Sequence, residues 1–166
     1  MSLGDCDKRT ALFDQVYDAH HQGVYAYLLA RTNNPATAMD LLQETFLKVW
    51  RHIDKVVDAD DDRRRYWLFH ISKNVVADYY RRRERRRSAV EQVTLDDCAH
   101  FTEPADPEHA YEVKESLREV DTAIRALPEE LRVPLIMQVL GGMTSTEIGA
   151  ILGRPPGTIR YQITRA

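Results

Sequence analysis

The 166-residue chain lacks the features that mark a membrane protein or a disulfide-stabilised protein. No apolar run approaches the roughly 20 residues that span a bilayer, so we expect no membrane insertion. The first residues show no signal-peptide pattern. Its two cysteines, Cys6 and Cys98, stand alone, outside any metal-ligand spacing. We therefore expect reduced thiols in a cytoplasmic protein, with a disulfide between them as the alternative.

Motifs of catalytic chemistry are also missing from the sequence. It contains no P-loop, nucleophile elbow or paired carboxylate site. His20 and His21 are adjacent and so point to different faces of a helix, and Asp14 and Asp18 give no ligand spacing with them. We expect no catalytic residue, no metal and no cofactor. The rival hypothesis, a nucleic-acid enzyme, would require metal-dependent turnover of DNA.

The charge of the chain is nearly balanced overall but uneven along its length. With 23 Lys and Arg against 26 Asp and Glu, the chain is unsuited to coating DNA by bulk charge. Residues 77–87 nevertheless read ADYYRRRERRR, with six arginines interrupted only by Glu84. Like charges four residues apart on a helix repel by about 0.2–0.5 kcal/mol per pair. Solvent and salt, an acidic partner or nucleic acid must offset this repulsion, and a solvated helix end is the simplest alternative.

Apolar residues recur at helical spacing through most of the chain, and no strand alternation is evident. Asn34 followed by Pro35 predicts a helix start, because asparagine caps a helix and proline suits its first position. Asp62, at the end of an acidic loop, is the predicted cap of the next helix. A further helix is expected to be interrupted or kinked at Pro134.

The periodicity fails between these helices and the last part of the chain. Residues 88–110 hold two prolines and several acids without a sustained period, which is typical of a linker. We therefore predict an all-α fold of two small helical domains, residues 8–88 and 112–166, joined by an irregular acidic linker at 89–111.

The end of the chain carries the most specific local signal. Thr144 and Glu147 form a T-x-x-E capping box, Gly149 leaves room for a steep helix crossing, and Gly153 suits a left-handed turn. This pattern predicts a helix-turn-helix, with an αα-corner that binds no ligand as the alternative. The predicted exposed residues of its second helix have side chains that reach phosphates and base edges in a major groove: Arg154, Thr158, Arg160, Tyr161, Gln162 and Arg165.

Aromatic side chains surround Lys73 and Asn74 in the middle of the chain: Tyr66, Trp67, Phe69, Tyr79 and Tyr80. Rings beside cations form a stacking platform for unpaired bases, at about 1–3 kcal/mol per base. For Trp67 and Tyr79 we favour a core position instead, and for Asn74 a contact with a base edge. The sequence thus offers one reader of duplex DNA and one platform for a single strand.

Together these patterns resemble a family, the small extracytoplasmic-function sigma factors of bacterial RNA polymerase. DLLQETFLKVW (40–50) resembles the region 2 helix that binds the β′ clamp helices, and YWLFHISKNVVADYYRRRERR (66–86) resembles the stretch that opens and captures the −10 element. The last 40 residues, from LPEELRVP onwards, resemble region 4, which binds the β flap and reads the −35 element.

The resemblance assigns roles to individual residues. It implies polymerase contacts by Asp40, Leu41, Gln43, Glu44 and Leu47. It implies −10 contacts by Tyr66, Lys73, Asn74, Asp78, Arg81 and Arg82, and −35 contacts by the six residues of the second helix named above. It also implies three partners, namely core RNA polymerase, promoter DNA and an anti-sigma factor. Tyr161 and Gln162 stand where the family has a small and a basic residue, so no −35 base preference is implied.

A stand-alone helix-turn-helix regulator is the alternative function. It would need a dimer interface and a matching half-site spacing, and the sequence offers no dimerisation helix. Strong specific binding of DNA without polymerase in a gel shift would favour this alternative.

Overall fold

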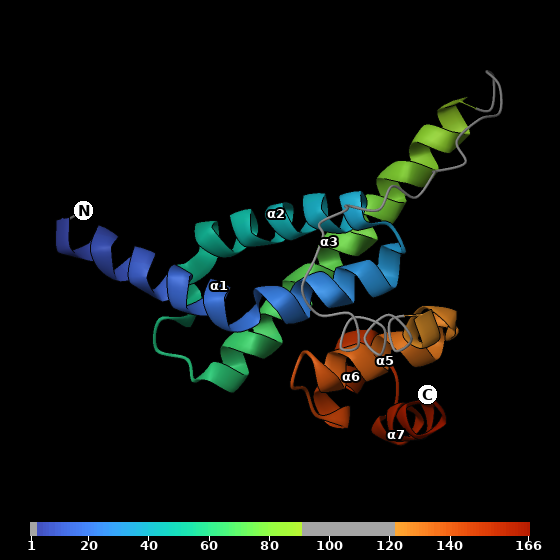
Figure 1. The fold of residues 1–166 in the computed structure, drawn as a ribbon. Coiled ribbons are helices and arrows are strands. Elements are labelled where there is room, and N and C mark those ends of the chain that lie inside the picture. The colour runs from blue at the N-terminus through green and yellow to red at the C-terminus, as the bar shows by residue number, and fades with distance from the viewer. Residues whose placement is uncertain (1–2, 91–121) are drawn as a thin grey trace, which may run out of the picture.

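The computed structural model describes residues 3–90 and 122–166, with side chains from residue 7 to 88 and from 122 onward. The elements it defines in these ranges are all helical, which confirms the all-α prediction (Figure 1). They are α1 (Leu3–Thr32), α2 (Pro35–His52), the short 3-10 helix η1 (Ile53–Val56), α3 (Asp61–Val90), α5 (Glu129–Val139), α6 (Ser145–Leu152) and α7 (Pro156–Arg165). The predicted linker and the first helix of the second domain lie mostly outside the described residues.

Local capping explains where α2 and α3 begin. The Asn34 side chain accepts a hydrogen bond from the backbone N–H of Thr37 at 2.9 Å, and Pro35 occupies the first helical position, as predicted. The cap of α3 was predicted wrongly. Asp60, not Asp62, accepts from the backbone N–H of Arg63 at 2.8 Å. The helix starts at Asp61, so the carboxylate one residue earlier is the one placed to meet a free N–H.

The first three long helices share a core of aliphatic and aromatic side chains. α2 buries one face against α1 and α3, through Ala38, Leu42, Phe46 and Val49. Two polar side chains in this core return their hydroxyls to the helix backbone: Thr45 donates to the Leu41 carbonyl and Ser72 to that of Leu68. Their hydrogen bonds are therefore satisfied although both residues are fully buried.

Helices α5, α6 and α7 form a second group around buried Met137, Ile148, Ile151 and Ile159. α5 continues through Pro134, so the helix is not interrupted there, and the alternative of a kink stays a prediction. A proline here removes a single backbone hydrogen bond, and the carbonyl left without a partner belongs to exposed Glu130, which water can reach.

The two groups pack against each other along what we call the seam, where α5 lies on α1 and α6 on α3 (Figure 1). The backbones approach closely here, because a Cβ on Gly23 of α1 would lie 2.6 Å from the carbonyl oxygen of Leu140. Arg132 donates to the Ala30 carbonyl at 2.9 Å, and Arg31 pairs with Glu129 at 2.7 Å. The buried residues of both groups consequently form one continuous core.

Candidate nucleic-acid interface

The helix-turn-helix predicted from the sequence is present in α6 and α7. The backbone N–H of Thr144 donates to the Glu147 carboxylate at 2.7 Å, and the N–H of Glu147 donates to the Thr144 hydroxyl at 3.3 Å. Gly153 ends α6 in the left-handed region, with φ of 69°. A Cβ on Gly149 would lie 2.5 Å from the carbonyl oxygen of Arg154, so only glycine allows the turn to pass this close.

Glu147 also connects this motif to the first helical group. Its carboxylate lies 3.5 Å from the Arg65 guanidinium on α3. Partial burial is the largest influence on the pKa of Glu147 and would raise it, but the two hydrogen bonds from Thr144 and the positive charge of Arg65 outweigh burial. The net effect is a lowered pKa. Glu147 is therefore held as a carboxylate at the seam.

The predicted −35 residues divide into an exposed set and a half-buried set. Thr158, Arg160, Tyr161 and Arg165 are exposed on α7. The Arg165 guanidinium donates to the Tyr161 hydroxyl at 3.0 Å and lies 5.7 Å from the ring centroid. Arg154 and Gln162 are half-buried, so their predicted exposure is wrong, and Arg154 lies in the turn before α7 and not on the second helix. The Arg154 guanidinium donates to the Gln162 side-chain oxygen at 3.3 Å. Four of the six side chains are therefore exposed on α7, with Arg165 bound to Tyr161, whereas the other two are half-buried and hold each other in place.

The predicted single-strand platform lies along the middle of α3. Asn74 is exposed, and its amide lies 3.4 Å from the ring nitrogen of His70, one turn earlier. The Tyr66 ring is 6.4 Å from the His70 ring, and Lys73, which precedes Asn74 in the chain, is half-buried. Tyr66, His70 and Asn74 therefore follow one another at four-residue spacing on one face of the helix.

The aromatic residues near this platform occupy different depths. Tyr66, Trp67 and Tyr79 are all partly buried against the core, which confirms the core position favoured for Trp67 and Tyr79. Phe69 was wrongly grouped with the platform, since it is 1% exposed and packs edge-on against Tyr27 at 5.8 Å. With Phe69 in the core, the platform has fewer available rings than the sequence suggested. Burial in the same core raises the pKa of the Tyr27 phenol to about 12.

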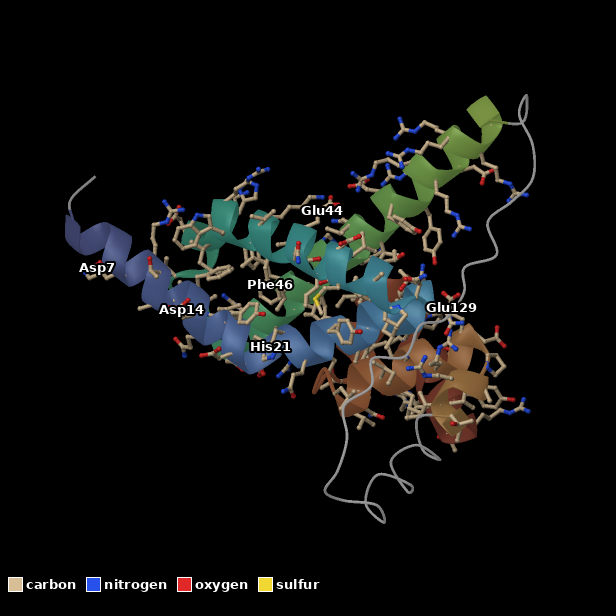
Figure 2. All side chains as sticks on the ribbon, turned by 45° about the horizontal axis from the view of Figure 1, so that its top comes forward. Asp7, Asp14, His21, Glu44, Phe46 and Glu129 are labelled. Carbon is tan, nitrogen blue, oxygen red and sulfur yellow. The ribbon has the colours of Figure 1, made fainter. Side chains whose placement is uncertain are left out.

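An ion-pair network links the predicted −10 residues to the predicted polymerase residues. Glu44 on α2 pairs with Arg82 on α3 at 2.9 Å and with Lys48 at 3.3 Å. Lys48 in turn lies 3.5 Å from Asp78, which pairs with Arg81 at 3.0 Å. Figure 2 shows Glu44 on α2 where that helix faces α3. Sequence reasoning had placed these residues in two separate sets and gave no sign that they meet.

The remaining predicted polymerase residues lie on the outer face of α2. Asp40 and Gln43 are exposed, and Leu47 is 58% exposed although apolar. Met39, which the sequence prediction missed, adds a second exposed apolar side chain, at 46%. Leu41 is a correction, because it is only 4% exposed and belongs to the core. α2 buries a broad stripe, so a leucine next to the polar face still turns inward.

Two further properties of the described residues bear on chemistry. No described helix combines the length and apolar character needed to cross a membrane. Among the same residues, no three His, Cys, Asp or Glu side chains are grouped so as to hold a metal ion. What the described residues do offer is a set of exposed polar, cationic and aromatic groups on three helices.

Comparison with known proteins explains why these helices occur together. Residues 16–86 match the sigma-70 region 2 family and residues 117–166 match sigma-70 region 4. An ECF RNA polymerase sigma-E factor of Salmonella typhimurium is 30% identical over 151 residues, covering 88% of this chain and 78% of that protein. The chain belongs to the ECF sigma factors. The platform and ion-pair network thus lie in region 2, and the helix-turn-helix in region 4.

Other relatives agree with this assignment. The ECF sigma factor SigE of Mycolicibacterium smegmatis is 31% identical over 92% of this chain, which spans only 58% of that longer protein. SigZ of Bacillus subtilis is 28% identical over 84% of this chain and 74% of its own length. A solved structure of RpoE from Bartonella quintana, in complex with the anti-sigma factor NepR, shares the fold with a TM-score of 0.65 over 92% of this chain and 90% of that one, at 24% identity.

Proposed function

We propose that this sigma factor binds core RNA polymerase and directs transcription initiation, holding the −10 element with region 2 and the −35 duplex with region 4. It acts on DNA in the cytoplasm and performs no catalysis of its own. One observation carries the proposal: a single chain has both the second helix of a helix-turn-helix, α7, and an exposed asparagine, Asn74, near aromatic side chains on α3. We take the first as the duplex reader and the second as the platform for an unpaired base. A stand-alone duplex reader has no use for the second surface.

The outer face of α2 is the proposed polymerase contact. It combines exposed Asp40 and Gln43 with the apolar side chains of Met39 and Leu47. Met39 and Leu47 are about two turns apart, with Gln43 between them, so apolar and polar side chains alternate along this face. Such a mixed composition is usual for a non-obligate protein interface. Glu44 lies at its edge and is already paired with Arg82, so we expect it to position Arg82 as well as meet polymerase.

Asn74 is the proposed base-reading residue of the −10 platform. Its amide can donate to and accept from a base edge, and the Tyr66 ring nearby offers a stacking surface. In run-off transcription with core polymerase, Asn74→Ala should alter −10 preference or promoter opening while core binding stays unchanged. If neither preference nor opening changes, the assignment of Asn74 is wrong.

The proposed function requires the seam to open. The −10 and −35 elements are named after their positions in the promoter. These positions differ by about 25 base pairs, which is about 85 Å at roughly 3.4 Å per pair. In the present conformation Arg65 on α3 touches Glu147 on α6, and Asn74 is nine residues farther along α3, about 14 Å at 1.5 Å per residue. Because α3 and α6 are in contact, we expect the two reading surfaces, although exposed, to lie closer together than the two elements do.

An anti-sigma factor is a further proposed partner. Two solved structures with this fold support it: RpoE with the anti-sigma factor NepR, and CnrH with the cytosolic domain of CnrY, the latter with a TM-score of 0.56 and 21% identity. A protein that stabilised the closed seam would inhibit this sigma factor without covering either DNA surface.

A further inference from the structure

Tyr161 on α7 is not explained by the packing of the helix-turn-helix. At 60%, it is the most exposed of the described phenylalanine, tyrosine and tryptophan side chains. It does not belong to the hydrophobic side chains that pack against the core, whereas Ile159 and Ile163 on the same helix do. The sequence comparison above also places Tyr161 where the family has a small residue. A large aromatic ring on the outer side of α7 is therefore a property of this chain that needs its own explanation.

The hydroxyl of Tyr161 already accepts a hydrogen bond within the protein. The Arg165 guanidinium, one helical turn later, donates to the phenol oxygen at 3.0 Å. The guanidinium carbon lies 5.7 Å from the ring centroid, near the outer limit for a cation–π contact, so the hydrogen bond is the main link. A guanidinium can only donate, and the phenol must therefore be the acceptor in this pair. The phenol proton is left to point away from Arg165, as a donor to an outside partner.

This arrangement holds Arg165 without cancelling its charge. The sequence of α7, PGTIRYQITR, contains no aspartate or glutamate. A carboxylate at position 161 would also hold the guanidinium one turn away, but it would neutralise it. A neutral phenol restrains the side chain and leaves the positive charge available to DNA. Tyr161 and Arg165 consequently present a hydrogen-bond donor, an apolar ring and a cation side by side.

The outward donor and the ring together fit one base better than the others. In the major groove, thymine presents the O4 acceptor next to its C5-methyl group. The phenol O–H can donate to O4 while the ring packs against the methyl group. Cytosine has an amino donor in place of O4, which would face the phenol proton, and adenine and guanine have no methyl group.

We propose that Tyr161 is a specificity-determining residue that reads one thymine in the −35 duplex through its hydroxyl and its ring. Arg165 is a positioning residue for this contact, because its hydrogen bond fixes the phenol as a donor. The proposal rests on the proposed function, since it takes α7 as the helix that enters the −35 major groove.

The test uses the protein bound to core polymerase and begins with selection of −35 sequences from a randomised promoter library. One thymine in the selected sequences should lose its preference in Tyr161→Ser, which leaves a residue of similar helix propensity. At that position, uracil keeps O4 but lacks the methyl group, and it should weaken binding of the unmodified protein about 4-fold. 5-Methylcytosine keeps the methyl group but replaces the acceptor with a donor, and it should weaken binding about 5- to 150-fold.

The variants separate the ring from the hydroxyl. Tyr161→Ser should bind the thymine and uracil duplexes equally. Tyr161→Phe keeps the ring, so it should retain the effect of uracil and lose most of the discrimination against 5-methylcytosine. Arg165→Met should behave like Tyr161→Phe, because the phenol oxygen is then free to accept. Each reading is a ratio of two affinities of one variant, so a general loss of DNA affinity does not affect it. Tyr17→Phe, at an exposed tyrosine of α1, is the control and should change neither ratio.

The proposal is overturned if the unmodified protein binds the thymine and uracil duplexes equally, or if Tyr161→Ser keeps the thymine preference. An Arg165→Met variant with undiminished discrimination against 5-methylcytosine would remove the positioning role of Arg165. Failure of the proposed function gives a different result, since the unmodified protein would then select no base at any −35 position.

Discussion

Opening of the seam can be tested with one methyl group. In Gly23→Ala the added Cβ meets three backbone atoms at 2.6 to 3.3 Å, namely the oxygen and carbon of the Leu140 carbonyl and the Cα of Gly141. Backbone atoms cannot rotate out of the way as a side chain can. The substitution should therefore disfavour the closed form, while leaving the region 2 helices free to fold.

Gly23→Ala has two effects, and only one of them changes the balance between the closed and open forms. Overpacking of this kind costs about 1–3 kcal/mol, and it applies only while the seam is closed. Within α1, replacing glycine by alanine favours the helix by up to about 1 kcal/mol in both forms. The closed form should therefore lose about 5- to 150-fold in population relative to the open form.

The assay is energy transfer between dyes on exposed residues of α2 and α7. Gly23→Ala should increase the mean distance between the two dyes while the helical circular dichroism stays the same. It should also improve the apparent affinity for core polymerase, because a larger fraction of the protein is already open. Gln22→Ala, at the exposed neighbouring position, is the control and should change neither reading. A distance unchanged by Gly23→Ala would refute the reasoning, as would a region 2 that unfolds.

Three further predictions concern individual contacts. Gly149→Ala places a Cβ 2.5 Å from the Arg154 carbonyl oxygen, so it should destabilise the helix-turn-helix by about 1–3 kcal/mol and weaken −35 binding, measured by thermal unfolding and duplex binding of the holoenzyme. The pKa of Glu147 in the folded protein lies below its ordinary value of 4.5. The ionised carboxylate therefore stabilises the folded state above pH 4.5, and this stabilisation is lost as the pH falls through the folded-state pKa. Glu147→Gln should accordingly lower the unfolding temperature at neutral pH and make little difference to it well below pH 4.5. A difference in unfolding temperature that stays the same at every pH would contradict this. Gln43→Ala with Glu44→Ala should weaken core polymerase binding, checked by competition with the unmodified protein, and equal competition would remove both residues from the contact.

The parts of the structure that the sequence predicted well are those set by local chemistry. Asn34 with Pro35, and Thr144 with Glu147, identify helix starts because a cap and its N–H lie within three residues. The fold class and the helix-turn-helix followed from such signals. The cap of α3 was misplaced because several neighbouring aspartates are chemically equivalent, and only the helix start distinguishes them.

What the sequence could not predict depends on packing between distant segments. Leu41 and Phe69 are buried because both α2 and α3 contact neighbours on more than one side, which helical spacing alone does not reveal. Arg31 and Glu129 are 98 residues apart, and no periodicity signals their contact. The seam between the two helical groups is therefore visible only in the structure.

Run-off transcription on a randomised promoter library tests the central claim most directly. Purified core polymerase should start at no selected site alone, and with this protein it should start downstream of a shared pair of −35 and −10 sequences. If addition of the protein brings no start-site selectivity, the promoter-recognition role is contradicted.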